Sequence, residues 1–322
     1  MSALHTTSTT DASSNGWREI APELTQIAEW SHSGAAVLAD GRIVVSTPGS
    51  AHVSVITPDG SVTTLPCGAG IYHGMATDPG ASSSAVWLAD IGVEADGGGL
   101  FLFDVDAKEL TDVGPDDRTT AHVVGWRPTA LAVERGITDP AGSVLWVADG
   151  YGHSLVHRLE DGRITLTIDG SASGQAFDCP HGIALEDRGD ETLVVVADRS
   201  NERLVWFDLT GAYVRELRSP LITSPSSITV YDNRLIVTEL FGGLIAVASD
   251  DTVTDLLNRS PRERVGAWPN EGDSDNLLRP AVIPGQINSP HGIATTKDGV
   301  VLTEWIIGGR TILLGHDIVG TP

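Results

Sequence analysis

The sequence has few basic residues, few cysteines and little helical patterning, and each shortage excludes a class of protein. Its 20 lysines and arginines stand against 43 aspartates and glutamates, which gives a formal charge of −23. Nucleic acids and anionic membranes are bound by basic surfaces, so we expect neither as a partner. Two cysteines in 322 residues cannot form the disulfide framework of a small secreted protein.

Long apolar runs are also missing. No window approaches the roughly 18 consecutive apolar residues that a membrane span requires. Residues 1–16 are small and polar, without the basic start and apolar stretch of a secretory signal. We expect these residues to form a disordered tail and the protein to be cytoplasmic.

A repeated pattern of short β runs takes the place of helical periodicity. Each run is about five residues long and is bounded by turn formers, as is typical of strands. The fourth copy of the repeat shows the pattern best, with runs at 180–185, 192–198, 203–207 and 212–217. Copies of this unit open at residues 33, 73, 129, 181, 226 and 291.

Six copies at this spacing predict an all-β fold, a six-bladed β-propeller with four strands in each blade. A β-sandwich would not need six copies with one type of opening. The sixth copy ends one strand short, and residues 17–20 could supply that strand and close the ring. We predict a single propeller over residues 17–322, with a polar insertion at 258–288 that is either a lid or a mobile loop.

Histidine occupies the same position in every second copy, at His73, His181 and His291. The intervening copies have Ser33, Thr129 and Ser226 there. The first strand of a blade lines the channel of a propeller, so the three imidazoles should converge on the axis. Three neutral nitrogens suit one zinc ion, or another divalent metal, and leave a position open for catalysis. A turn preference for Pro-His-Gly would not select alternate blades.

The other histidines show no such register and are expected in loops or at the surface. His32 and His153 are the exceptions, because both should lie near the rim of the channel.

Two stretches resemble NHL repeats and are more narrowly similar to the peptidyl-hydroxyglycine α-amidating lyase family. They are Trp146-Val147-Ala148-Asp149-Gly150-Tyr151-Gly152-His153-Ser154 and, in the next copy, Pro180-His181-Gly182-Ile183-Ala184-Leu185 with Ala197-Asp198-Arg199-Ser200-Asn201. The general resemblance covers residues 30–318, and the close match covers about 146–206.

The resemblance implies a six-bladed propeller that cleaves a carbinolamide-type C–N bond. It implies His73, His181 and His291 as zinc ligands, Tyr151 as the catalytic tyrosine and Arg199 as the active-site arginine. A tyrosine close to a cation and an arginine would have its phenolate favoured, and the guanidinium offers a fork for an oxyanion or carboxylate. Each residue could instead have a purely structural role. Tyr151 could be an aromatic side chain packed between blades, and Arg199 could form a salt bridge to an aspartate.

Two departures from the family pattern point to a small polar substrate rather than a peptide. Residues 31–34 are Ser-His-Ser-Gly where the family has a substrate-binding arginine. Gly292 stands where an aspartate would serve a structural calcium.

Acidic residues end the second run of five copies, at Asp90, Asp149, Asp198, Glu239 and Glu304. Recurrence in nearly every copy favours a structural role, such as binding the backbone of the neighbouring blade. Glu304 is also a candidate catalytic acid or base, with Trp305 as a wall of the pocket.

The sequence therefore favours a zinc-dependent lyase or hydrolase that cleaves a C–N bond, carbinolamide or amide-like, in a small polar substrate. One alternative is a lactonase-type sugar-acid hydrolase, although propellers of that kind use Glu, Asn and Asp around the metal. A non-catalytic NHL binding module is the other. Bound metal would separate the enzymes from the binding module.

Overall fold

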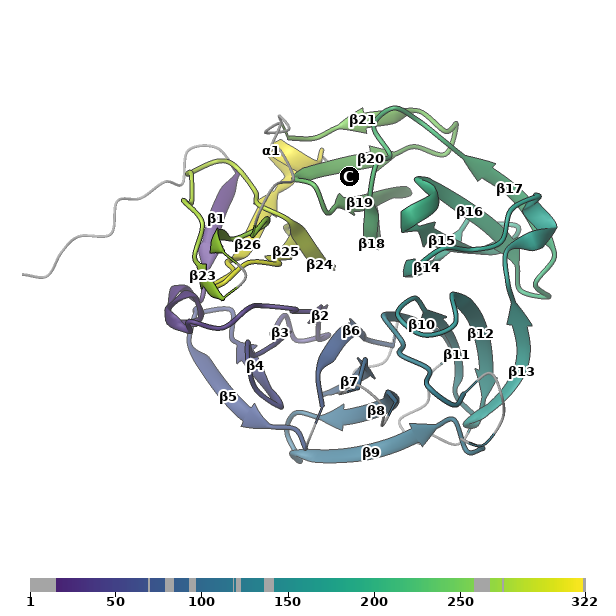
Figure 1. The fold of residues 1–322 in the computed structure, drawn as a ribbon, viewed down its shortest axis with the longest axis horizontal. Helices are drawn as coiled ribbons and strands as arrows, with labels where there is room; N and C mark the ends of the chain where they lie inside the picture. The colour runs from purple at the N-terminus through teal and green to yellow at the C-terminus, as the bar shows by residue number, and fades with distance from the viewer. Residues whose placement is uncertain are drawn as a thin grey trace, which may run out of the picture.

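Six four-stranded antiparallel sheets surround a central axis, which confirms the predicted β-propeller (Figure 1). The computed structural model describes residues 16–68, 70–78, 84–92, 97–117, 119, 123–135, 142–257, 267–273 and 275–320. Within those ranges, no helix has the length and hydropathy needed to cross a membrane.

Blades one to five each take four consecutive strands, ordered from the axis outward. They are β2 (Ala35–Val37), β3 (Ile43–Ser46), β4 (His52–Ile56) and β5 (Val62–Pro66); β6 (Tyr72–Ala76), β7 (Ala85–Asp90), β8 (Gly99–Asp104) and β9 (Glu109–Gly114); β10 (Ala130–Arg135), β11 (Val144–Asp149), β12 (Leu155–Glu160) and β13 (Arg163–Ile168); β14 (Pro180–Asp187), β15 (Thr192–Asp198), β16 (Arg203–Asp208) and β17 (Tyr213–Leu217); β18 (Pro225–Tyr231), β19 (Arg234–Glu239), β20 (Gly243–Val247) and β21 (Val253–Asp255).

The sixth blade joins the two ends of the chain. It consists of β24 (Pro290–Thr296), β25 (Gly299–Glu304), β26 (Thr311–Gly315) and the first strand, β1 (Trp17–Ile20). β1 pairs antiparallel with β26, with Trp17 opposite Leu314, and this confirms the predicted closure by the N-terminal strand. A short helix, α1 (His316–Val319), follows β26. β1 covers the outer edge of β26 and gives the sixth blade four strands like the other five.

The core lies between neighbouring blades. Each sheet is covered on both faces, so its middle strands are continuous apolar runs rather than alternating ones. In β15, for example, every residue from Leu193 to Asp198 is buried. Its Val195 and Ala197 pack with Ile228 and Val237 of the next blade.

The 258–288 insertion contains structure that the sequence did not predict. Strands β22 (Glu271–Asp273) and β23 (Asn276–Leu278) pair as a hairpin. Residues 258–266 and 274 lie outside the described residues, as do residues 1–15 of the expected tail. The interpretation of this insertion as a lid stays a prediction.

Acidic residues at the ends of the second strands hold each blade's own opening segment. Asp90 accepts a hydrogen bond from the Ile71 N–H at 2.7 Å, and Glu239 accepts one from the Ser224 N–H at 2.7 Å. Asp149, Asp198 and Glu304 bind backbone N–H groups in the same way. The expected structural role is therefore present, but the bonds go to the same blade rather than to its neighbour. They fix the residues that lead into the axial position.

Candidate metal centre at the propeller axis

The structure brings His73, His181 and His291 together at the axis. Each is the second residue of an innermost strand, β6, β14 or β24, and each is at most 2% exposed. Ring centroids are 4.8 Å apart for His73 and His181, 4.4 Å for His73 and His291, and 5.2 Å for His181 and His291. The alternation read from the sequence thus corresponds to a real cluster of imidazoles.

An irregularity at the start of each inner strand accompanies these side chains. The pairing register shifts at His73 between Tyr72 and Gly74, and it shifts at the equivalent place around His181 and His291. A β-bulge adds a residue to one strand and re-aims its side chain. The bulges are therefore the local reason that these histidines face the axis.

Each of the three imidazoles is held by the neighbouring blade. The Nδ1 atoms donate to backbone carbonyls of the residues that occupy the aligned position in the intervening blades: His73 to Thr129 at 2.6 Å, His181 to Ser226 at 2.9 Å and His291 to Ser33 at 3.3 Å. A carbonyl can only accept, so the proton is on Nδ1 and the lone pair is on Nε2. Metal-binding histidines are oriented by partners of this kind.

The glycine after each histidine makes room for the same carbonyl. A Cβ atom would lie 2.6 Å from the Thr129 oxygen at Gly74, 2.3 Å from the Ser226 oxygen at Gly182 and 2.6 Å from the Ser33 oxygen at Gly292. No side chain fits at such distances without a backbone shift. The His-Gly pair is thus a packing requirement of the hydrogen bond between blades.

A fourth histidine, His32, joins the cluster from the loop before β2. Its ring lies 5.1 Å from His73 and 5.2 Å from His291, and it stacks on Trp305 at 5.3 Å. The possible ligand atoms of His32, His73 and His291 all lie within 4.8 Å of one another, so this group could hold a metal ion. The sequence placed His32 only near the rim, because it precedes the aligned residue Ser33 and breaks the alternation.

Unpaired nitrogen atoms at this centre fit a bound cation. The Nε2 atoms of His32, His73 and His291 are buried and have no hydrogen-bond partner within the described part of the chain. The Nε2 atom of His181 lies 3.1 Å from the Tyr151 hydroxyl. Buried polar atoms without partners are costly, and a divalent metal would satisfy them.

Burial keeps the imidazoles neutral. It lowers the pKa values of His73, His181 and His291 well below the ordinary value for histidine, and neighbouring cationic groups add to the effect. Burial, then Arg199 and then Arg127 lower the pKa of His32 to about 4. Neutral imidazole is the form that binds a metal.

Tyr151 and Arg199 lie beside the cluster. The Tyr151 ring is 5.2 Å from His73 and 5.4 Å from His181, and the Arg199 guanidinium lies 5.5 Å from the Tyr151 ring centre. Burial raises the pKa of Tyr151, and Arg199 opposes this shift only in part. The expected effect of the arginine has the right sign, but desolvation outweighs it. Arg199 forms no salt bridge to Asp198, whose partner is Arg203.

Glu304 does not belong to this group. Its side chain is fully buried, and its two oxygens bind Arg310 at 2.6 and 2.8 Å and the Asn288 N–H at 2.6 Å. Glu304 thus has the same structural role as the other strand-end acids, and its role as a catalytic acid or base stays a prediction. The adjacent Trp305 does reach the cluster, through His32.

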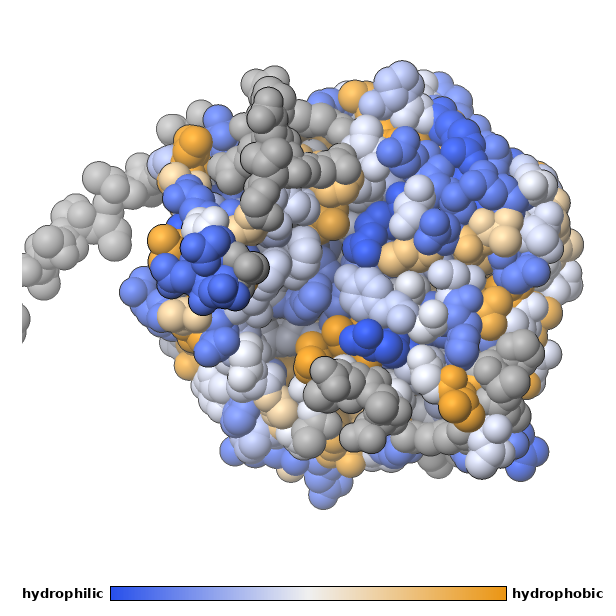
Figure 2. Space-filling view, in the orientation of Figure 1, coloured by the Kyte–Doolittle hydropathy of each residue, from blue (hydrophilic) through white to orange (hydrophobic). Residues whose placement is uncertain are grey.

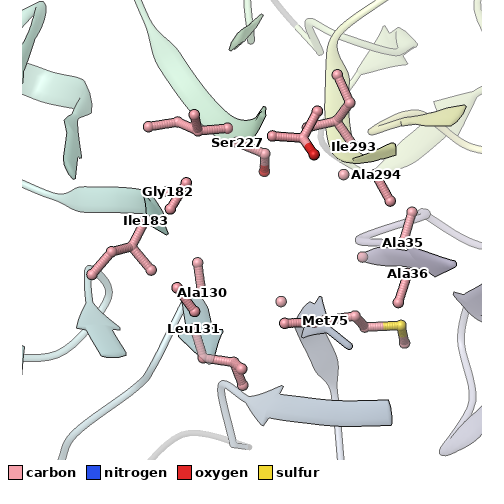
Figure 3. A pocket seen from close by; sticks show the side chains of 18 of the residues that line it. Ala35, Ala36, Met75, Ala130, Leu131, Gly182, Ile183, Ser227, Ile293 and Ala294 are labelled. Carbon is pink, nitrogen blue, oxygen red and sulfur yellow. The ribbon is translucent and has the colours of Figure 1, made fainter. Parts of the chain in front are cut away.

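Two cavities adjoin the histidines. An axial channel of about 390 Å³ is lined by the inner strands and reaches His73, and Figure 3 shows small residues such as Ala35, Ala130 and Gly182 around it. A groove of about 360 Å³ runs from Trp30 and His32 between the first two blades. The space-filling view is hollowed around the axis (Figure 2). A small molecule could therefore approach the cluster.

Comparisons with known proteins agree on the fold. A streptogramin B lyase structure is 14% identical with a TM-score of 0.58, covering 93% of this chain and 97% of its own. A gluconolactonase from Xanthomonas campestris is 16% identical with a TM-score of 0.58, covering 96% and 93%. An inactive virginiamycin B lyase from Staphylococcus aureus, bound to quinupristin, is 14% identical with a TM-score of 0.53, covering 87% and 79%.

At such low identity, these structures show that the chain shares the propeller fold with these proteins. No protein-family profile matches the sequence. No curated protein matches it either. The resemblance to the amidating lyases stays a prediction.

Proposed function

We propose that this protein is a zinc-dependent lyase or hydrolase that cleaves a C–N bond, carbinolamide or amide-like, of a small polar substrate at the propeller axis. The observation that carries the proposal is the buried Nε2 atoms of His32, His73 and His291, which have no hydrogen-bond partner in the described part of the chain and could hold one ion together. His73, His181 and His291 are the proposed ligands. Bound zinc would act there as a Lewis acid that polarises an oxygen of the substrate.

The chain prepares this centre before any ligand binds. Bonds from Nδ1 to carbonyls fix the tautomer and the direction of each axial imidazole. The three axial imidazoles are at most 2% exposed, and electrostatic interactions with a substrate are stronger at such buried groups than in water. Preorganisation of this kind reduces the reorganisation that a reaction must pay for.

Tyr151 and Arg199 supply the proposed acid–base and anion-binding groups. The Tyr151 hydroxyl lies 3.1 Å from His181 Nε2, where it can exchange a proton with a substrate at the cluster. The Arg199 guanidinium lies over the Tyr151 ring and offers donors to a developing oxyanion. The cleavage of a C–N bond, rather than another bond, rests on the resemblance seen in the sequence.

A lactonase-type sugar-acid hydrolase is the second candidate, and the fold shared with a gluconolactonase favours it. The axial positions here are histidine, serine and threonine rather than carboxylates, and the strand-end acids bind backbone instead. This favours the first candidate. A binding module would have no use for the unpaired nitrogens.

Metal content of the purified protein tests the proposal. We expect about one zinc per chain in the parent, and loss of zinc in His73→Ala, His181→Ala and His291→Ala. His52→Ala, on the third strand of the first blade, is the control and should keep its zinc. A folded parent that binds no divalent metal contradicts the proposal. Turnover of carbinolamides, amides and lactones then separates the two enzymatic candidates.

A further inference from the structure

Four aromatic side chains form a continuous wall next to the histidine cluster. The aromatic wall consists of Trp30, Phe241, Trp268 and Trp305. Ring centroids are 4.9 Å apart for Trp30 and Trp305, 6.1 Å for Trp268 and Trp305, and 5.2 Å for Phe241 and Trp268. These residues come from four separate segments of the chain.

The wall is not part of a sealed core. All four of its side chains are partly exposed, whereas Trp87, Trp146 and Trp206 inside the blades are at most 2% exposed. Trp305 also stacks on His32, so the wall begins at the cluster itself. Aromatic surface that gathers beside a polar centre, open to solvent, is typical of a ligand site.

Two arginines lie near the cluster on the side of Tyr151. The guanidinium groups of Arg127 and Arg199 are 6.0 and 5.5 Å from the Tyr151 ring centre. Arg127 Nε donates to the Ile91 carbonyl, and Arg199 Nη2 donates to the Cys179 sulfur. Neither arginine has a carboxylate partner among the residues that the structure describes.

Other buried arginines of this chain are neutralised. Arg203 pairs with Asp198 at 2.7 Å, and Arg310 pairs with Glu304 at 2.6 Å. Arg127 and Arg199 are largely covered and have no carboxylate partner in the described part of a chain with 43 acidic residues. An arginine is costly to bury without a counter-charge, so this pair is suited to an anionic ligand.

His32 lies between the two features. Its ring is 5.3 Å from Trp305 of the wall and 6.3 Å from Tyr151, which carries the arginine pair. A ligand that touched the wall and the arginines together would pass over the histidine cluster.

We propose that the substrate is a small anion with a flat apolar group, such as an aromatic ring. The ring would lie against the aromatic wall, and a carboxylate or similar group would bind Arg127 and Arg199. This inference rests on the proposed function in taking the histidine cluster as the reacting centre. It adds the substrate class, and it assigns Arg127 and the wall to substrate binding.

Calorimetric titration with three matched probes tests the inference. Phenylacetate has both the ring and the charge, phenylacetamide lacks the charge, and acetate lacks the ring. We expect phenylacetate to bind about 10-fold more tightly than either of the others, given the strength of charge-assisted hydrogen bonds and aromatic contacts. The titrations are run on zinc-loaded and on metal-free protein, because a carboxylate can also bind zinc. The preference should persist without metal.

Two variants separate the contributions. Arg127→Gln should remove the preference for phenylacetate over phenylacetamide, because the charge is no longer recognised, and should keep the preference for phenylacetate over acetate. Arg127→Lys should restore part of the preference over phenylacetamide. Trp268→Leu should remove the preference over acetate and keep that over phenylacetamide. Arg42→Gln, at a surface ion pair, and Trp17→Phe, on β1, are the matched controls and should bind like the parent.

Equal affinity for the three probes in the folded parent, or preferences unchanged by both variants, would overturn the inference. Zinc content measured on the same samples keeps the two proposals apart. Zinc without probe discrimination leaves the metalloenzyme standing and removes the substrate class. Discrimination among the probes by a protein that binds no metal would contradict the zinc site and leave the substrate class standing.

Discussion

The propeller carries two rings of repeated side chains, the strand-end acids and the axial histidines, and the two rings differ in the hydrogen bonding of their polar atoms. The strand-end acids recur in five of the six blades, and their oxygens accept hydrogen bonds from backbone N–H groups or from arginines. The axial histidines recur in alternate blades, and within the described residues two of the three leave Nε2 without a partner. The residues repeated in nearly every blade bind the backbone, whereas the histidines repeated in every second blade break the symmetry, which supports the proposed site.

The largest expected effect is a loss of stability when one of the strand-end acids is replaced. Glu304→Gln should cost about 3–5 kcal/mol of unfolding free energy, because it leaves the buried Arg310 without its counter-charge. Denaturant unfolding measures this loss. The protein that remains folded should still bind zinc, and a large loss of zinc with normal stability would place Glu304 in the site after all.

Zinc that binds to the axial histidines should raise the free energy of unfolding of the parent protein. At about 1,000 times its dissociation constant, a ligand of the native state adds about 4 kcal/mol. Thermal unfolding with and without zinc should therefore show a rise in Tm for the parent and none for His291→Ala. An equal rise in both proteins would mean that zinc binds elsewhere.

Gly182→Ala should affect both the fold and the site. The added Cβ would lie 2.3 Å from the Ser226 carbonyl oxygen, which also accepts the His181 hydrogen bond. We expect a loss of about 1–3 kcal/mol, as for other overpacked positions, together with weaker zinc binding. Gly189→Ala, which meets no atom within 4 Å of the added Cβ but is in a left-handed conformation, provides a comparison for backbone strain without the clash.

The smallest effect concerns pH in the metal-free protein. The pKa of His32 is about 4 in the folded state, below its ordinary value of 6.5. The unfolded chain therefore binds a proton more readily, and stability is lost as the pH falls from about 6.5 towards 4. We expect His32 to account for about 1–2 kcal/mol of this loss after allowance for its partial exposure. The free energy of unfolding of His32→Gln should change less with pH across this range than that of the parent. An equal dependence on pH in both proteins would contradict the assignment.

Features that recur along the chain could be predicted, and features that depend on tertiary contacts could not. The six openings predicted the propeller, and the alternation of His73, His181 and His291 predicted their convergence. His32 was placed only near the rim because its contact with the cluster depends on how the loop before β2 folds back. One repeat-level expectation needed correction: the strand-end acids bind the backbone of their own blade rather than that of the neighbouring blade, and spacing could not identify this partner.

Arg127 and the aromatic wall show the same limit. Arg127 precedes the aligned residue Thr129 by two positions, and its backbone N–H is held by Asp149. Nothing in that spacing indicates that its side chain has no carboxylate partner among the described residues. The wall joins residues from 30 to 305 in the chain, and no local pattern links them.

The hydrogen bonds between blades connect the histidine cluster to the whole ring of blades. Each axial imidazole on blade two, four or six is bonded to a carbonyl of the next blade around the ring. An ion held by the three imidazoles would therefore be connected to all six blades at once. Separation of neighbouring blades would therefore weaken metal binding, and bound metal would in turn hold the six blades together.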